Sequence, residues 1–144
     1  MNIRPVVASD VPALVCVEQT QPRCAQWGEK GWHTELKGTS SQIWGACENK
    51  ELVGFIALRL AAGVCEILNL GVRPDYCRRG IGTQLLTHAV EFVRNQGGEV
   101  ITLEVHAQNA PAIHLYQRAG FSPVGVRKQF YTDGQDAWVM RITL

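Results

Sequence analysis

The sequence lacks the features that define several large classes of protein. Its five cysteines are odd in number and no two are spaced as C-x-x-C, so neither a disulfide framework nor a zinc site is indicated. No apolar run approaches the roughly 18 residues of a membrane-spanning helix. The N-terminus lacks the layout of a signal peptide. We therefore expect a cytoplasmic protein with no membrane partner and no metal.

An excess of one charge is also lacking. The chain has 14 Lys and Arg against 13 Asp and Glu, so its formal net charge of +1 creates no overall field that attracts nucleic acid. Of its 144 residues, 46% are apolar and 19% are charged, which is sufficient for a buried core. No repeat, low-complexity tract or linker divides the chain. We expect a single domain over residues 1–144 that binds no nucleic acid directly.

Strand and helix signals alternate along the first part of the chain. Asn2–Val7 reads as a strand, and Ser9 or Asp10 offers the N-cap of a helix with Pro12 in its first turn. Residues 20–40 mix glycines with tryptophans, and we expect one or two short helices and a mobile loop there.

Three apolar, β-rich runs follow, at Ile43–Cys47, Leu52–Leu60 and Val64–Val72. Only a few residues separate one run from the next. Connections this short suit hairpins and exclude helical crossovers. This part of the sheet should therefore be antiparallel.

A longer helix separates these strands from the rest of the chain. It should begin near Ile81, follow an apolar helical period and stop at Gly97 and Gly98. The next strand, Glu99–His106, can then pair in parallel with Val64–Val72.

The C-terminal part should hold a short helix and two strands. Asn109 can cap the helix, which should end at Gly120. The strands should be Val124–Tyr131 and Ala137–Thr143, joined by a turn at Asp133-Gly134. The whole predicts an α+β protein with a mixed, mostly antiparallel sheet.

The stretch YCRRGIGTQLL, residues 76–86, places two arginines and two glycines at the start of the longer helix. A helix N-terminus presents unpaired N–H groups, and glycines let a phosphate approach the backbone closely. The stretch is not a Walker loop, and Leu85 stands where a dinucleotide fingerprint needs its third glycine. The remaining interpretations are a phosphate cradle and a surface loop with two solvated arginines.

At these residues the chain resembles the GNAT family of N-acetyltransferases. VRPDYCRRGIGT is similar to the family's acetyl-CoA pyrophosphate loop, [QR]-x-x-G-x-[GA], except that Cys77 stands where the family has Gln or Arg. NAPAIHLYQRAGF, residues 109–121, is similar to a second family segment. The likeness extends over nearly the whole chain. Within the family it is greatest to the bacterial ribosomal-protein alanine N-acetyltransferases.

The resemblance implies a fold and a coenzyme site. The fold would be a sheet of about seven strands, with a parallel pair splayed at its centre and about four helices beside it. Acetyl-CoA would be the donor. Its pyrophosphate would lie on the loop Arg78, Arg79, Gly80, Ile81, Gly82 and Thr83. Its pantetheine arm would lie on Leu70, Gly71 and Val72, which end a strand at a bulge, and near Asn109.

Two residues are candidates for proton transfer. Strand alternation places Glu104 opposite the apolar face of its strand, where it is either functional or a strand-end carboxylate paired with a surface cation. The resemblance implies that Glu104 accepts the proton of the attacking amine. It also implies that Tyr116 protonates the leaving thiolate, although a core tyrosine with a satisfied hydroxyl is common.

The acceptor side is predicted more loosely. By resemblance, Trp27, Glu29 and Tyr131 border the cleft that a protein N-terminus enters, although each could instead be a packing residue. Acidic residues such as Glu18, Glu29 and Asp133 could attract a basic peptide. The four histidines show no ligand spacing, and His106 reads as a polar residue at a strand end.

These observations lead to one preferred function and two alternatives. The preferred function is transfer of an acetyl group to the N-terminal α-amine of a protein, here a ribosomal protein that begins with alanine. Direct attack in a ternary complex is expected because no cysteine is an evident nucleophile. The alternatives are a lysine or small-amine acetyltransferase and a non-catalytic acyl-CoA-binding regulator. The sequence indicates no oligomeric state.

Overall fold

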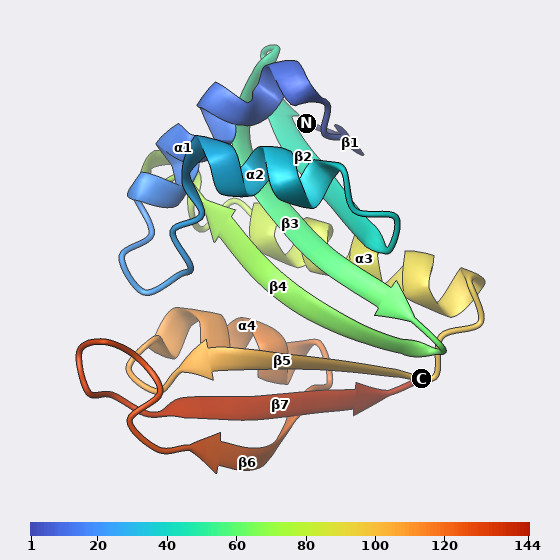
Figure 1. Cartoon of the computed structure of the whole chain (residues 1–144), viewed down its shortest axis with the longest axis vertical. Helices are drawn as coiled ribbons and strands as arrows, with labels where there is room; N and C mark the ends of the chain where they lie inside the picture. Colours follow the sequence, from blue (N-terminus) through green and yellow to red (C-terminus); the bar gives the residue numbers. More distant parts are fainter.

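The computed structural model describes residues 1–144 as a seven-stranded sheet in the order β1-β2-β3-β4-β5-β7-β6 (Figure 1). The strands are β1 Asn2–Pro5, β2 Ser41–Glu48, β3 Glu51–Ala61, β4 Val64–Val72, β5 Val100–His106, β6 Ser122–Arg127 and β7 Ala137–Thr143. The helices are α1 Val11–Gln19, α2 Gly28–Leu36, α3 Ile81–Asn95 and α4 Ala110–Arg118, with short 3₁₀ turns at Ala8–Asp10 and Pro74–Tyr76. None of the helices combines the length and the hydropathy that a membrane-spanning segment needs. The predicted α+β sheet is confirmed.

Strands β2, β3 and β4 form an antiparallel meander, as their short connections predict, and β1 pairs with its edge at β2. Helices α1 and α2 lie on one face of this meander, and α3 lies on the other (Figure 1). Asp10 stands at the N-cap of α1 but does not cap it with its side chain. Its carboxylate instead accepts two hydrogen bonds of 2.8 Å from the Arg4 guanidinium and one from the Val7 N–H. Charge pairing with β1 replaces the predicted cap.

Two buried clusters hold the helices against the sheet. The larger one lies between the sheet and the α3 and α4 side, and includes Leu85, Leu86 and Ala89 of α3. The smaller one packs α1 and α2 through side chains such as Leu14 and Trp32. Each fully buried leucine contributes about 1.5–3 kcal/mol by leaving water.

Strands β4 and β5 pair in parallel over only four residues each, Val64–Ile67 with Val100–Leu103. Beyond this ladder they diverge toward their C-terminal ends, as Figure 1 shows. The bulge that accompanies the divergence is at Leu68, which is skipped where β4 pairs with β3. The prediction of a bulge at Gly71 is wrong, since Gly71 pairs in register with Phe55.

Gly71 is instead required for close packing. A Cβ atom at this position would lie 3.0 Å from Gln21 Cγ and 3.1 Å from Phe55 Cζ. Both side chains therefore pack directly on the backbone of β4.

Strand β6 is shorter than predicted and ends at Arg127. Two residues later Gln129 has a left-handed backbone with φ of 51°, and its N–H donates to Asp136 Oδ1. Both features turn the chain out of the sheet. Phe130 and Tyr131 consequently lie in the β6–β7 loop rather than in a strand, and the turn near Gly134 is one part of that loop.

Candidate active site

The divergence of β4 and β5 opens a cavity of about 670 Å³ between their C-terminal halves. Its walls come from the α1–α2 loop, both strands, α4 and the β6–β7 loop. Six residues predicted from the sequence line it: Leu70, Glu104, Asn109, Tyr116, Tyr131 and Asp133. The topology therefore brings the two candidate proton-transfer residues into one space.

Glu104 both faces the cavity and pairs with a cation, the two alternatives that the sequence left open. Its side chain lines the cavity and is one third exposed, while Oε1 accepts a 2.7 Å hydrogen bond from the Arg127 guanidinium on β6. The structure shows no hydrogen bond to Oε2. One carboxylate oxygen is thus held by a cation and the other is free to accept a proton.

Tyr116 is buried on α4, and burial raises the pKa of its phenol well above the ordinary value near 10. The hydroxyl stays protonated at neutral pH and makes no hydrogen bond within the protein. It is therefore available as a proton donor. Asn109 begins this helix, and its side-chain oxygen accepts from the Ala112 N–H at 3.3 Å, as the sequence predicted.

The loop before α3 has the backbone of an anion site. Gly80 is the N-cap residue with a left-handed φ of 79°, and a Cβ atom there would face open space. The N–H groups of Ile81, Gly82 and Thr83 donate to no acceptor within the protein. These free amides at the positive end of a helix fit a pyrophosphate.

The two arginines of this loop play different structural parts. Arg78 adopts a left-handed φ of 65°, and the Arg79 guanidinium lies 4.9 Å from the centre of the Tyr76 ring. Stacking on an aromatic face orients the Arg79 side chain without neutralising its charge.

At the end of β4, the backbone groups that β5 leaves unpaired are partly occupied. The α1–α2 loop supplies two donors, Gln21 Nε2 to the Val72 carbonyl at 2.7 Å and Cys24 Sγ to the Leu70 carbonyl at 3.5 Å. The Leu70 N–H donates to the side-chain oxygen of Asn69. Any pantetheine arm would meet this strand beside an already anchored loop.

Of the residues predicted on the acceptor side, Tyr131 and Asp133 line the cavity. Burial, followed by the charge of Glu104, raises the Tyr131 pKa to about 12. Trp27 and Glu29 do not line this cavity: Trp27 packs on Trp32 at 4.6 Å, and Glu29 is exposed at the start of α2. 

Glu18 is not available to attract a peptide, contrary to expectation. It is buried, and its carboxylate accepts 2.8 Å hydrogen bonds from the N–H groups of Trp27 and Gly28. A carboxylate at this place stabilises the N-terminus of α2.

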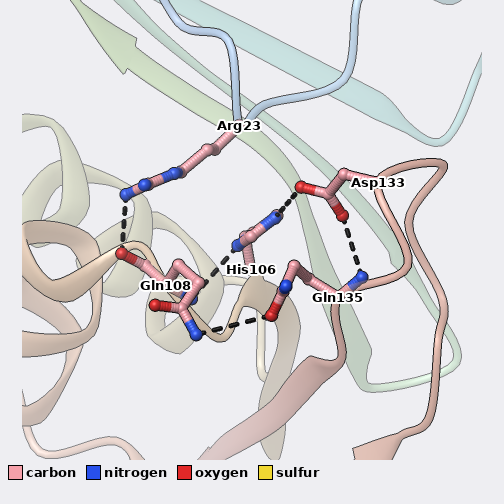
Figure 2. A network of polar contacts seen from close by, with 5 residues as sticks. All are labelled: Arg23, His106, Gln108, Asp133 and Gln135. Carbon is pink, nitrogen blue, oxygen red and sulfur yellow. Dashed lines mark hydrogen bonds and ion pairs between the residues drawn. The ribbon is translucent and has the colours of Figure 1, made fainter.

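Sequence reasoning missed several residues at the cavity. Cys24 lines it, and burial raises the pKa of its thiol to about 11. His106 ends β5 as expected but is buried there, and its Nε2 lies 2.7 Å from Asp133 Oδ2 (Figure 2). The residues belong to segments far apart in the chain, so no local pattern could have identified the group.

Comparisons with known proteins agree with this geometry. A sequence profile of the Acetyltransferase (GNAT) family matches residues 13–121. Ribosomal protein bS18-alanine N-acetyltransferase of Escherichia coli K12 is 30% identical over 146 residues, which cover 99% of this chain and 97% of that protein. N-alpha-acetyltransferase RimI of Mycobacterium tuberculosis is 35% identical over 120 residues, which cover 80% of this chain and 74% of that one.

The fold comparison points the same way. The crystal structure of the ribosomal-protein-S18-alanine N-acetyltransferase from E. coli matches with a TM-score of 0.90 and 30% identity, covering 99% of this chain and 92% of that one. Profile, full-length relative and fold are thus consistent with the cavity and the helix N-terminus described above. The chain belongs to the GNAT family of acetyltransferases, whose acetyl donor is acetyl-CoA.

Proposed function

We propose that this protein transfers an acetyl group from acetyl-CoA to the N-terminal α-amine of a protein, and that the acceptor is a ribosomal protein beginning with alanine. The observation that carries the proposal is the shared cavity of Glu104 and Tyr116, which offers one proton acceptor and one proton donor. The E. coli relative, which covers almost the whole chain, is named for the alanine of ribosomal protein bS18, and the M. tuberculosis relative is named as an N-alpha-acetyltransferase; both support this acceptor. Such an enzyme would work in the cytoplasm.

The chemistry of Glu104 suits an α-amine better than a lysine. An ordinary α-amine has a pKa of about 7.7–8.0, whereas that of lysine is about 10.4. Near neutral pH about a tenth of the α-amine is already neutral, against fewer than about one lysine in a thousand. A carboxylate with one free oxygen is a sufficient base for the first and a weak one for the second.

The other proposed roles follow from position and charge. The amides of Ile81, Gly82 and Thr83 would hold the pyrophosphate, with Arg78 and Arg79 beside it and Asn109 nearer the cavity. Tyr116 would give its proton to the departing sulfur as the amine bond forms, and Tyr131 would orient the amine. Nothing in this scheme requires a metal.

Direct transfer between the two substrates is favoured over a covalent enzyme intermediate. Cys24 is the one cysteine that lines the cavity, and its pKa of about 11 keeps the thiol protonated at neutral pH. A protonated thiol is a poor nucleophile. The amine would therefore attack the thioester in a ternary complex.

The test measures CoA release with two short basic peptides. One begins with a free alanine, and the other has the same sequence with a blocked N-terminus and an internal lysine. Turnover of the free-alanine peptide alone is expected. Preference for the lysine peptide would make this a lysine acetyltransferase. Acetyl-CoA binding without turnover of either peptide or of small amines would indicate a regulatory binding module.

A further inference from the structure

A single hydrogen-bond network holds the segments around the acceptor side of the cavity (Figure 2). Gln108, in the turn between β5 and α4, is its centre. Its carbonyl accepts from the Arg23 guanidinium at 2.6 Å, its N–H donates to His106 Nδ1 at 3.1 Å, and its side chain lies 3.4 Å from that of Gln135. One residue thus connects the α1–α2 loop with the β6–β7 loop.

Arg23 has a special place in this network. Its bond to the Gln108 carbonyl is the one side-chain hydrogen bond that joins the β1–β4 half of the molecule to the β5–β7 half. All other side-chain hydrogen bonds and ion pairs lie within one half. Because β4 and β5 have diverged at this level, Arg23 spans the open end of the cleft.

The His106 hydrogen bonds fix its tautomer. Because Nδ1 accepts the Gln108 N–H, the proton of a neutral ring lies on Nε2, where it points to Asp133 Oδ2. Asp133 Oδ1 accepts in turn from the Gln135 N–H at 2.9 Å. The His106 ring also stacks on Tyr131, with 4.7 Å between the ring centroids. His106 therefore holds the loop that carries Tyr131.

We propose that Arg23 and His106 are positioning residues, which together with Gln108 form a strap that presets the β6–β7 loop for the acceptor amine. The proposal rests on the function proposed above and adds the residues that set acceptor affinity. Without the strap, binding of the acceptor would have to order two loops that belong to different halves of the molecule. That ordering cost falls on acceptor binding rather than on the chemical step.

The kinetic test compares Arg23→Ala with Arg94→Ala. Arg94 is an exposed arginine on α3 that makes no side-chain hydrogen bond and does not line the cavity. Arg23→Ala should raise the KM for the free-alanine peptide about tenfold, the factor of one lost hydrogen bond to a charged group. Its kcat and the KM for acetyl-CoA should change less than about twofold, and Arg23→Lys should recover part of the loss.

A second comparison tests whether the two residues act together. His106→Phe keeps a ring against Tyr131 and removes both hydrogen bonds of the imidazole. In the variant that combines it with Arg23→Ala, the rise in acceptor KM should be smaller than the product of the single effects. The proposal would be overturned if the KM increase in the double variant equalled the product of the two single increases. A fall in the acceptor KM, or equal changes in the KM for the acceptor and for acetyl-CoA, would also overturn it.

A measurement without any acceptor separates this idea from the proposed function. In Arg23→Ala, amide hydrogen exchange should quicken in peptides covering residues 106–109 and 131–136, although neither contains residue 23. Unchanged exchange would show that no strap exists. If exchange quickens in a protein that never turns over the alanine peptide, the proposed acceptor is wrong while the strap stands.

Discussion

The proposed coenzyme loop and the proposed acceptor side of the cavity are built in opposite ways. The loop Arg78–Thr83 is continuous in sequence and offers backbone amides set by a left-handed Gly80. The acceptor side is assembled from three distant segments and depends on side chains of Arg23, His106 and Asp133. A site of backbone amides depends little on side-chain identity, whereas a site built from side chains depends on it directly. Acceptor choice can therefore change by few substitutions while the donor stays the same.

The largest expected effect is on the chemical step, at Glu104, which belongs to neither the loop nor the acceptor side. Glu104→Gln should lower kcat by about 10²–10⁴, the usual loss on removing a general base, without weakening acetyl-CoA binding. Steady-state kinetics and calorimetry measure the two quantities. Glu66→Gln is the matched control, because Glu66 lines the same cavity from β4 and has no assigned role. Equal losses in both variants would remove Glu104 as the base.

Tyr116→Phe should lower kcat by about 10², toward the smaller end for a lost general acid. Since its hydroxyl has no partner within the protein, the urea midpoint of unfolding should stay unchanged. Activity close to the unaltered level would mean that water or another group protonates the leaving sulfur.

Gly80→Ala tests the backbone site alone. At a φ of 79° an alanine is strained by about 1–2 kcal/mol, so the protein should lose stability and the KM for acetyl-CoA should rise several-fold. Gly97→Ala is the control, because Gly97 has a φ of 77° and equally open surroundings at the other end of α3. Both should lose similar stability, and only Gly80→Ala should affect acetyl-CoA. If Gly80→Ala instead changed the KM for the acceptor peptide, the loop and the acceptor side would not be independent.

The acceptor side should show its own dependence on pH. Hydrogen bonds from His106 and then from the Gln135 N–H hold the pKa of Asp133 below its ordinary value near 3.8. A carboxyl with a lowered folded pKa adds stability above 3.8, which is lost as the pH falls further through the folded pKa. Asp133→Asn should therefore flatten the fall in stability below that pH, measured by urea unfolding. An unchanged profile would show that the hydrogen bonds are not kept in solution.

The smallest effect is expected at Cys24. Because its thiol stays protonated and direct attack needs no nucleophile from the enzyme, Cys24→Ser should change kcat by less than about threefold. A loss comparable with that of Glu104→Gln, together with an acetylated cysteine in the mass spectrum, would establish a covalent intermediate.

The elements that the sequence predicted correctly are those with a local pattern in the chain. The short connections predicted the β2–β4 meander, the helical period predicted α3, and the capping residue Asn109 predicted α4. The resemblance of the loop at Gly80 led to acetyl-CoA. All of these signals lie within a few neighbouring residues.

The predictions were wrong where a residue six to ten positions away binds the predicted side chain or turns the predicted strand. Asp10 was expected to cap α1, but Arg4 binds its carboxylate. Glu18 was expected at the cleft, but the N-terminus of α2 buries it. Tyr131 was placed in a strand that ends four residues earlier. Each outcome depends on a tertiary contact that spacing along the chain does not encode.

The four-residue ladder between β4 and β5 also has a consequence for the order of folding. This ladder is the one strand pairing that joins the β1–β4 half of the sheet to the β5–β7 half, and it can form only after α3 has crossed between its two strands. Because closing a long loop costs entropy before its contacts form, we expect the ladder to assemble after the rate-limiting step. Weakening it, for example by Ile101→Val, should speed unfolding and leave the refolding rate almost unchanged. The chain would thus fold as two sheets first and acquire its catalytic gap last.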